Sequence, residues 1–253
     1  SAYSSIHRLS GFFPGISATD ITIPSEKGQL LYIFNGNGRP ISTIDSISKA
    51  VLYSFSYDSN GRLISVSDVD NNVTVIERNI DGRPVAIVGP YGQRTTLSVD
   101  SNGYLTSITN PAGETHQINY TDDGLLTSFT DPNGNTSRYT YNSLGFLESA
   151  TDAAGNTQTF TRTDLADGHS VDRISPLSRT TTYTIEDLPN GDRQRSIQAS
   201  DGTEVVNLIG TNGSTKIRWT DGTAGEIQKG PDPRFGMQSP ITESGTLTIG
   251  SIT

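Results

Sequence analysis

The fold of this chain is decided by a short stretch, Asp131-Pro-Asn-Gly-Asn-Thr-Ser-Arg-Tyr-Thr-Tyr-Asn-Ser-Leu-Gly145. It begins with a Pro-Asn-Gly turn signal, places Tyr139 and Tyr141 on either side of the polar Thr140, and ends at a second turn glycine. An apolar residue at every second position is typical of a β-strand with one buried and one wetted face. The stretch therefore predicts one strand between two turns.

The same pattern recurs every 21 residues, in two interleaved series of turns. The first series of turn glycines is Gly61, Gly82, Gly103, Gly124 and Gly145; the second is Gly92, Gly113, Gly134 and Gly155, with Asn71 one period earlier. A fixed period of this length is the signature of a repeat architecture. Asn-Gly and Asp-Gly pairs favour the positive φ of tight hairpins. Each repeat therefore comprises two strands and two turns, and we predict an all-β antiparallel hairpin meander that forms a curved or spiralling sheet.

One strand of each repeat contains a contradiction in its spacing. Leu126 follows its turn glycine by two residues and Phe129 follows it by five, and the other repeats keep both columns. An even and an odd offset cannot both face one side of a regular strand. Either a β-bulge lies between the two columns, or the first column belongs to the turn.

Composition limits what such a sheet is able to do. The net charge is −9, hydrophobic residues make up 32%, and there is no cysteine. The low apolar content favours a one-layer sheet, and the acidic balance argues against non-specific binding of nucleic acid. No apolar run is long enough to span a membrane, and disulfides and cysteine-ligated zinc are excluded. We expect no cofactor.

Candidate metal ligands and catalytic groups are sparse. The histidines are His7, His116 and His169, and His116 is predicted at an outward-leaning strand position without facing partners. The acidic residues near turns, among them Asp68, Asp131 and Asp152, are better explained by Asx turns than by calcium, which needs six to eight converging oxygens. We expect no metal site and no enzymatic activity.

Segments such as Phe55-Ser-Tyr57-Asp58-Ser-Asn-Gly61 and Tyr139-Thr-Tyr141-Asn142 resemble the YD repeats of the bacterial Rhs family, shared with the Tc-toxin C component and teneurins. The resemblance implies a shell of spiralling antiparallel sheet that encloses a C-terminal effector or toxin module of the same polypeptide. It also implies a secreted or cell-surface protein, bacterial in origin. The self-cleaving module of such proteins is not recognisable here.

The resemblance and the period divide the chain into four segments. Residues 1–27 are expected to form an irregular N-terminal cap or entry strand, and 28–163 the repeat array. Residues 164–229 read as a degenerate continuation of the meander, and 230–253 as a Pro/Gly/Thr-rich C-terminal segment, whose prolines exclude an interior strand over 230–237. Exposed sheet edges predict capping by these termini or an edge-mediated dimer.

The aromatic column leaves two roles open. Its rings supply the buried face of the sheet, or they stack against sugars as platforms formed by Tyr57, Tyr120, Tyr139 and Tyr141. The first reading makes the chain a non-enzymatic scaffold, a wall segment of an Rhs/YD-repeat shell that encloses or presents an effector. The alternative is an extracellular module that binds carbohydrate or a cell-surface glycan.

Overall fold

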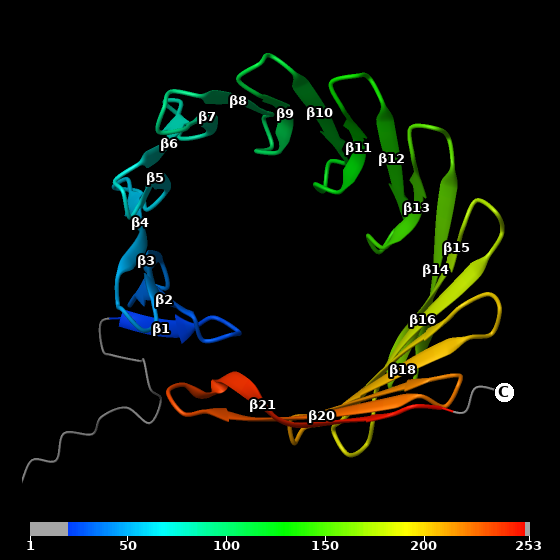
Figure 1. Cartoon of the computed structure of the whole chain (residues 1–253). Coiled ribbons are helices and arrows are strands. Elements are labelled where there is room, and N and C mark those ends of the chain that lie inside the picture. The colour runs from blue at the N-terminus through cyan, green and yellow to red at the C-terminus, as the bar shows by residue number, and fades with distance from the viewer. Residues whose placement is uncertain (1–19, 251–253) are drawn as a thin grey trace, which may run out of the picture. The chain divides into compact units, whose positions relative to one another are not determined.

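The computed structural model describes residues 20–250; residues 1–19 and 251–253, with His7 among them, lie outside the described part. Every regular element between residues 20 and 250 is a strand, from β1 to β21 (Figure 1). No helix in this range is long and apolar enough to cross a membrane. The all-β antiparallel fold predicted from the 21-residue period is confirmed.

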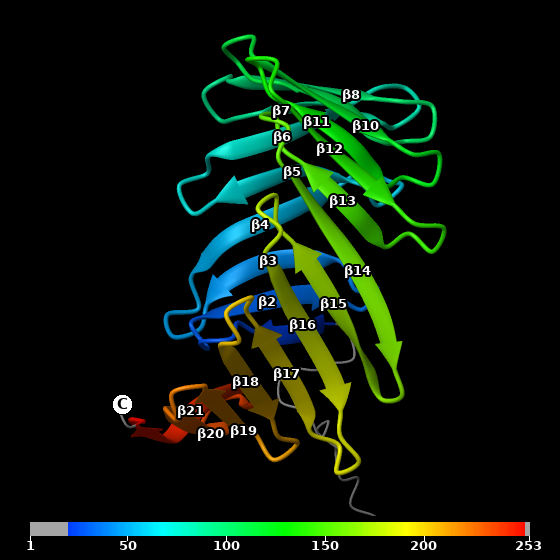
Figure 2. The same ribbon diagram turned by 90° about the vertical axis from the view of Figure 1, so that its right-hand side faces the viewer.

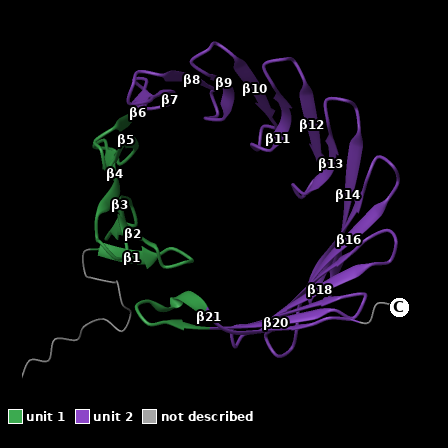
Figure 3. Ribbon diagram, in the orientation of Figure 1, with its two compact units in different colours: residues 1–75, 230–241 green, residues 76–229, 242–253 purple. Residues whose placement is uncertain are grey.

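The chain divides into two compact units, which Figure 3 draws in green and purple. Unit 1 comprises residues 1–75 and 230–241, and β1 to β6 pair antiparallel in sequence order within it. Its strands are β1 (Asp20–Pro24), β2 (Leu30–Asn35), β3 (Pro40–Asp45), β4 (Val51–Tyr57), β5 (Leu63–Asp68) and the start of β6 (Val73–Arg78).

Unit 2 comprises residues 76–229 and 242–253, and β7 to β20 again pair antiparallel in sequence order. Figure 2 shows its longest hairpins, around β14, β15 and β16, side by side. The strands are β7 (Pro84–Val88), β8 (Arg94–Val99), β9 (Leu105–Thr109), β10 (Thr115–Tyr120), β11 (Leu126–Thr130), β12 (Thr136–Tyr141), β13 (Leu147–Thr151), β14 (Thr157–Leu165), β15 (Gly168–Ile174), β16 (Thr180–Asp187), β17 (Arg193–Gln198), β18 (Glu204–Ile209), β19 (Ser214–Trp219), β20 (Ala224–Asp232) and β21 (Gly236–Thr248). The end of β20 and the first part of β21, within residues 230–241, belong to unit 1.

A recurrent β-bulge resolves the contradiction in strand spacing. In β10 and β11, Asn119 pairs with Ser128 but the next residue, Tyr120, pairs with Leu126, so Thr127 is left over. The same shift occurs between β4 and β5, β8 and β9, and β12 and β13, 21 residues apart or a multiple of it. An extra residue in one strand reverses the alternation beyond it. The bulge therefore places both apolar columns on the same face.

The two faces of the sheet differ in chemistry. One face, here called the apolar face, carries cross-strand pairs such as Leu97–Ile108, Ile118–Phe129 and Tyr139–Ala150. The opposite, polar face carries hydroxyl pairs, and three of them repeat with the period: Thr109–Thr115, Thr130–Thr136 and Thr151–Thr157, with Oγ1–Oγ1 distances of 2.8, 2.9 and 2.8 Å. The hydroxyl groups on this face therefore satisfy one another's hydrogen bonds across neighbouring strands.

The sheet has almost no closed core. Among the described apolar residues only Leu31, Ala86 and Ile118 are buried, and most of the apolar face is half-buried. The strands of each unit form a single layer (Figures 1 and 2). Neighbouring side chains of the same sheet therefore cover one another, and no second layer does so, as the 32% hydrophobic content led us to expect.

Three of the second-series turns are held by a leading aspartate. Asp131 accepts hydrogen bonds at Oδ1 from the backbone N–H groups of Asn133 (2.9 Å) and Asn135 (2.8 Å), and at Oδ2 from the Asn135 side chain (2.8 Å). The same arrangement recurs at Asp68 and Asp152. These Asx turns explain the three aspartates, and the residue that follows each by three supplies the positive φ: Gly134 (φ 87°), Gly155 (φ 85°) and, after Asp68, Asn71 (φ 61°).

The C-terminal segment of unit 1 begins at the end of a strand. β20 runs to Asp232 and includes Pro231, which lies beyond Gln228, the last residue paired with β19, so the expectation that the prolines exclude an interior strand over 230–237 stays a prediction. Pro231 is the penultimate residue of β20, where the ladder ends and a missing N–H costs little. After the turn, Ser239 is 1% exposed, and its hydroxyl lies 3.0 Å from the carbonyl oxygens of both Ser25 and Glu26.

Candidate functional site

The four candidate stacking tyrosines all lie on the apolar face, but two of them have structural partners. The Tyr57 hydroxyl donates to the Pro40 carbonyl at 2.6 Å, and the Tyr141 hydroxyl donates to the Leu126 carbonyl at 2.9 Å. Burial raises the pKa of Tyr57, against the opposing effect of the Arg39 charge. Each of these hydroxyls fastens its ring to a neighbouring strand.

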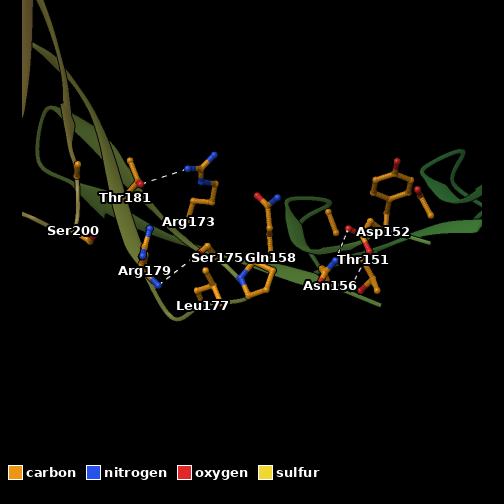
Figure 4. A pocket seen from close by; sticks show the side chains of 15 residues that line it. Thr151, Asp152, Asn156, Gln158, Arg173, Ser175, Leu177, Arg179, Thr181 and Ser200 are labelled. Carbon is orange, nitrogen blue, oxygen red and sulfur yellow. Dashed lines mark hydrogen bonds between the residues drawn. The ribbon is translucent and has the colours of Figure 1, made fainter. Parts of the chain in front are cut away.

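Tyr120 and Tyr139 have different surroundings. The Tyr120 ring lies 5.3 Å from the Tyr104 ring, centroid to centroid, in a tilted pair. Tyr139 pairs across the strands with Ala150, and its hydroxyl has no hydrogen-bond partner among residues 20–250. Tyr139 instead lines a hollow of about 760 Å³ in unit 2 (Figure 4). Of the four tyrosines, it is the one that the structure places in this hollow.

The hollow lies on the apolar face where β12 to β17 meet their second-series turns. Register brings its residues to one side of the sheet, since Ala150 pairs with both Tyr139 and Gln158, and Arg173 pairs with Thr181. In Figure 4 the side chains of Gln158 and Arg173 project from adjacent strands to the same side. The full lining is Ser137, Tyr139, Ala150, Thr151, Asp152, Asn156, Gln158, Arg173, Ser175, Pro176, Leu177, Arg179, Thr181, Ala199 and Ser200.

Two guanidinium groups in this lining lack a counter-charge. No carboxylate within residues 20–250 forms an ion pair with Arg173 or Arg179. Nη2 of Arg173 lies 3.5 Å from Oγ1 of Thr181, which is a weak contact. Nε of Arg173 is buried and has no hydrogen-bond partner. The nearest ring, that of Tyr183, is 6.0 Å from the guanidinium carbon.

Other charged groups near the hollow are already engaged. Arg162, also on the apolar face, pairs with Asp164 at 2.8 Å and lies 4.7 Å over the Phe146 ring. Asp152, the carboxylate in the lining, accepts three hydrogen bonds from its own turn. The hydrogen bond from the Asn156 side-chain amide makes the largest contribution to the lowered pKa of Asp152, and this lowered pKa keeps the carboxylate ionised. The hollow is thus a polar and cationic recess with aliphatic groups around it.

Metal binding and acid–base chemistry find no support in this lining. His116 pairs with Ile108, and its ring lies 5.2 Å from the Phe129 ring, so the outward position predicted for it is wrong. His116 lies two residues before Ile118 in an uninterrupted part of β10, so regular alternation places it on the apolar face. No group of three or more His, Cys, Asp or Glu residues able to hold a metal occurs between residues 20 and 250.

Sequence reasoning identified Tyr139 but missed Gln158, Arg173 and Arg179. Arg173 lies where the strict period has already ended, opposite Phe160 in the next strand. An arginine facing an aromatic residue of the apolar column was the available signal. It required knowing the register of a hairpin that the 21-residue repeat does not fix.

Comparison with known proteins places this architecture in a family. The family model described as "Teneurin YD-shell" matches residues 18–250. Human teneurin-1 is 35% identical over 80 residues and mouse teneurin-3 is 32% identical over 80 residues, in each case 32% of this chain and 3% of the relative. The chain therefore spans about 3% of the length of these relatives.

Solved structures of toxin complexes are similar to this chain at low identity. The crystal structure of TcdB2-TccC3 without its hypervariable C-terminal region matches with a TM-score of 0.37 and 14% identity, over 79% of this chain and 16% of that one. The crystal structure of TcdB2-TccC3-Cdc42 gives 0.36 and 14%, over 83% and 15%. The match to the family model extends over nearly all described residues, and the chain therefore belongs to the teneurin YD-shell family.

Proposed function

We propose that this chain is a non-enzymatic wall segment of an Rhs/YD-repeat shell that encloses an effector or toxin module of its parent protein. The observation that carries the proposal is the apolar face. Cross-strand pairs such as Ile118–Phe129 repeat along a one-layer sheet without a second layer over them. Half-exposed apolar surface of this extent marks a contact surface for another polypeptide.

The polar face supports the same role from the other side. Its hydroxyl pairs, Thr109–Thr115 and those that follow at the same period, satisfy one another's hydrogen bonds. A wall with one wetted and one half-apolar side separates water from an enclosed chain. We further propose that the parent protein is secreted or displayed at the cell surface.

Protease protection of the parent protein tests enclosure. The effector module is expressed within the full parent polypeptide and, separately, without the wall, and both are exposed to a non-specific protease under native conditions. We expect the module to survive only in the presence of the wall. Equal cleavage rates of the module in both proteins would overturn the proposal.

Carbohydrate recognition is the second candidate, and the hollow beside Tyr139 is the observation that favours it. A glycan array separates the two candidates. Glycan binding that is lost in Tyr139→Ala but kept in Tyr141→Ala, with both variants folded, would support sugar stacking at Tyr139. The absence of binding to any glycan would remove this candidate.

A further inference from the structure

We infer that the hollow beside Tyr139 is a docking site for a carboxylate-bearing peptide segment, held by Arg173 and Arg179. This inference rests on the proposed enclosure of a polypeptide and names the chemistry of the segment that the wall contacts at this place. The volume of about 760 Å³ suits a few side chains of a partner.

Charge is the first argument. The chain as a whole carries −9, yet this recess presents two guanidinium groups without an ion-pair partner within residues 20–250. Asp152, the carboxylate in the lining, is occupied by its own turn. The lining therefore carries two positive charges against the one negative charge of Asp152, and a carboxylate entering the hollow meets a net positive recess in a chain of net charge −9.

The unsatisfied nitrogen of Arg173 is the second argument. Its Nε is buried and has no hydrogen-bond partner, which is unfavourable in a folded protein. Nε and Nη2 of an arginine together form a fork that matches the two oxygens of a carboxylate. A small rotation of the side chain turns this fork into the hollow, where a carboxylate satisfies both nitrogens.

The aliphatic lining favours a peptide over a saccharide. Ala150, Pro176, Leu177 and Ala199 surround the charged groups, and Leu177 is 75% exposed. Tyrosine and arginine beside aliphatic groups are the residues enriched at protein interfaces. The lining offers a sugar a single ring, that of Tyr139, which is half-buried against its own sheet.

The test uses the whole chain and a pair of matched peptides. A fluorescent Leu-Glu-Leu-Glu-Leu peptide, capped at both ends, is titrated with the protein, and its anisotropy is compared with that of Leu-Gln-Leu-Gln-Leu. A short polyuronate provides the saccharide arm. We expect the Glu peptide to bind, the Gln peptide to bind about tenfold more weakly or not at all, and added salt to weaken binding.

Variants locate the site. Arg173→Gln and Arg179→Gln are each expected to weaken binding of the Glu peptide by about tenfold. Arg138→Gln is the matched control, because Arg138 adjoins Tyr139 in β12 but lies on the polar face, exposed and outside the lining. Arg179 is exposed, so its substitution keeps the test valid even where Arg173→Gln impairs folding.

Three outcomes would overturn the inference: equal binding of the two peptides, binding unchanged by Arg179→Gln, or binding of the polyuronate without binding of the Glu peptide. The inference and the proposed function fail separately. If the wall protects the effector from protease but binds no Glu peptide, enclosure stands and this site does not. If the Glu peptide binds but the effector is not protected, the reverse holds.

Discussion

The buried hydroxyl of Ser239 lies 3.0 Å from the carbonyl oxygen of Ser25, a residue 214 positions earlier in the chain. The same hydroxyl is within 3.0 Å of the Glu26 carbonyl, and nearby Arg234 reaches Ser46 at 3.4 Å. These contacts fasten the segment after β20 to the β1–β2 turn and Ser46, within unit 1. They join segments from near the start and from residues 230–241 of the chain in one compact unit.

Removal of this hydroxyl is expected to destabilise unit 1. Ser239→Ala deletes a donor at a position that is 1% exposed, and we expect the free energy of unfolding to fall by about 0.5–1.5 kcal/mol, the net contribution of one hydrogen bond, because the Ser25 carbonyl keeps the Gly28 N–H as a partner. Denaturant unfolding measures the change. The control is Ser59→Ala, at an exposed turn position without a side-chain hydrogen bond in the described structure. Equal stability of both variants would contradict this account of the contact.

A methyl group at Gly28 tests how closely the segment fits. A Cβ there would lie 2.9 Å from Nη2 of Arg234 and 3.1 Å from Oγ of Ser239, whereas one at Gly38 would have no atom within 4 Å. Both glycines have a positive φ, so Ala at either position costs about 1–2 kcal/mol of backbone strain. We expect Gly28→Ala to lower the free energy of unfolding further than Gly38→Ala. Equal losses in the free energy of unfolding of the two variants, measured by denaturant titration, would show that the segment with Arg234 and Ser239 moves aside for the added methyl group.

Substitutions of two tyrosines in β12 distinguish the contribution of a hydrogen bond to stability from that of ring packing. Tyr141→Phe removes the donor to the Leu126 carbonyl, and we expect a loss of about 0.5–1.5 kcal/mol in the free energy of unfolding. Tyr139→Phe deletes a hydroxyl without a partner among residues 20–250, so its stability is expected to be unchanged. Thermal unfolding followed by circular dichroism compares the two. A larger loss for Tyr139→Phe would show that its hydroxyl, not that of Tyr141, holds the sheet together.

The aspartates of the second-series turns make the stability of the fold depend on pH. Hydrogen bonds from the Asn72, Asn135 and Asn156 side chains, with those of the turn backbones, lower the pKa values of Asp68, Asp131 and Asp152 below 3.8. Because the folded pKa is lower than the unfolded one, each carboxylate stabilises the fold above the unfolded pKa. This contribution is lost as the pH falls through the folded pKa. We expect Tm to decline as the pH falls below about 4.

The paired variants Asn135→Ala and Asn133→Ala check this dependence. Asn135→Ala removes the side-chain bond to Oδ2 of Asp131 and is expected to make the decline in Tm shallower. Asn133 lies in the same turn but contributes its backbone N–H to Asp131, which alanine retains. If both variants follow the wild-type pH profile of Tm, the side-chain amides do not set these pKa values.

The sequence by itself determined the repeat, the strands and the turns of this protein. Glycines at a 21-residue spacing, an aromatic column at period two and low apolar content predict a one-layer antiparallel meander, because these are local properties of strands and hairpins. The sequence also left two explanations for the even and odd offsets of Leu126 and Phe129 from their turn glycine: a β-bulge between them, or a place for Leu126 in the turn.

The tertiary structure alone decided which face each side chain takes and what it meets there. The bulge at Thr127 shifts the pairing of β11 with β10 and so places Leu126 on the same face as Phe129. Beyond the strict period, pairing of β14 with β15 brings Arg173 onto the apolar face, and the segment around Ser239 meets the turn at Ser25. These relationships depend on pairings between distant residues, which a local pattern does not encode because a shift of one residue exchanges the faces.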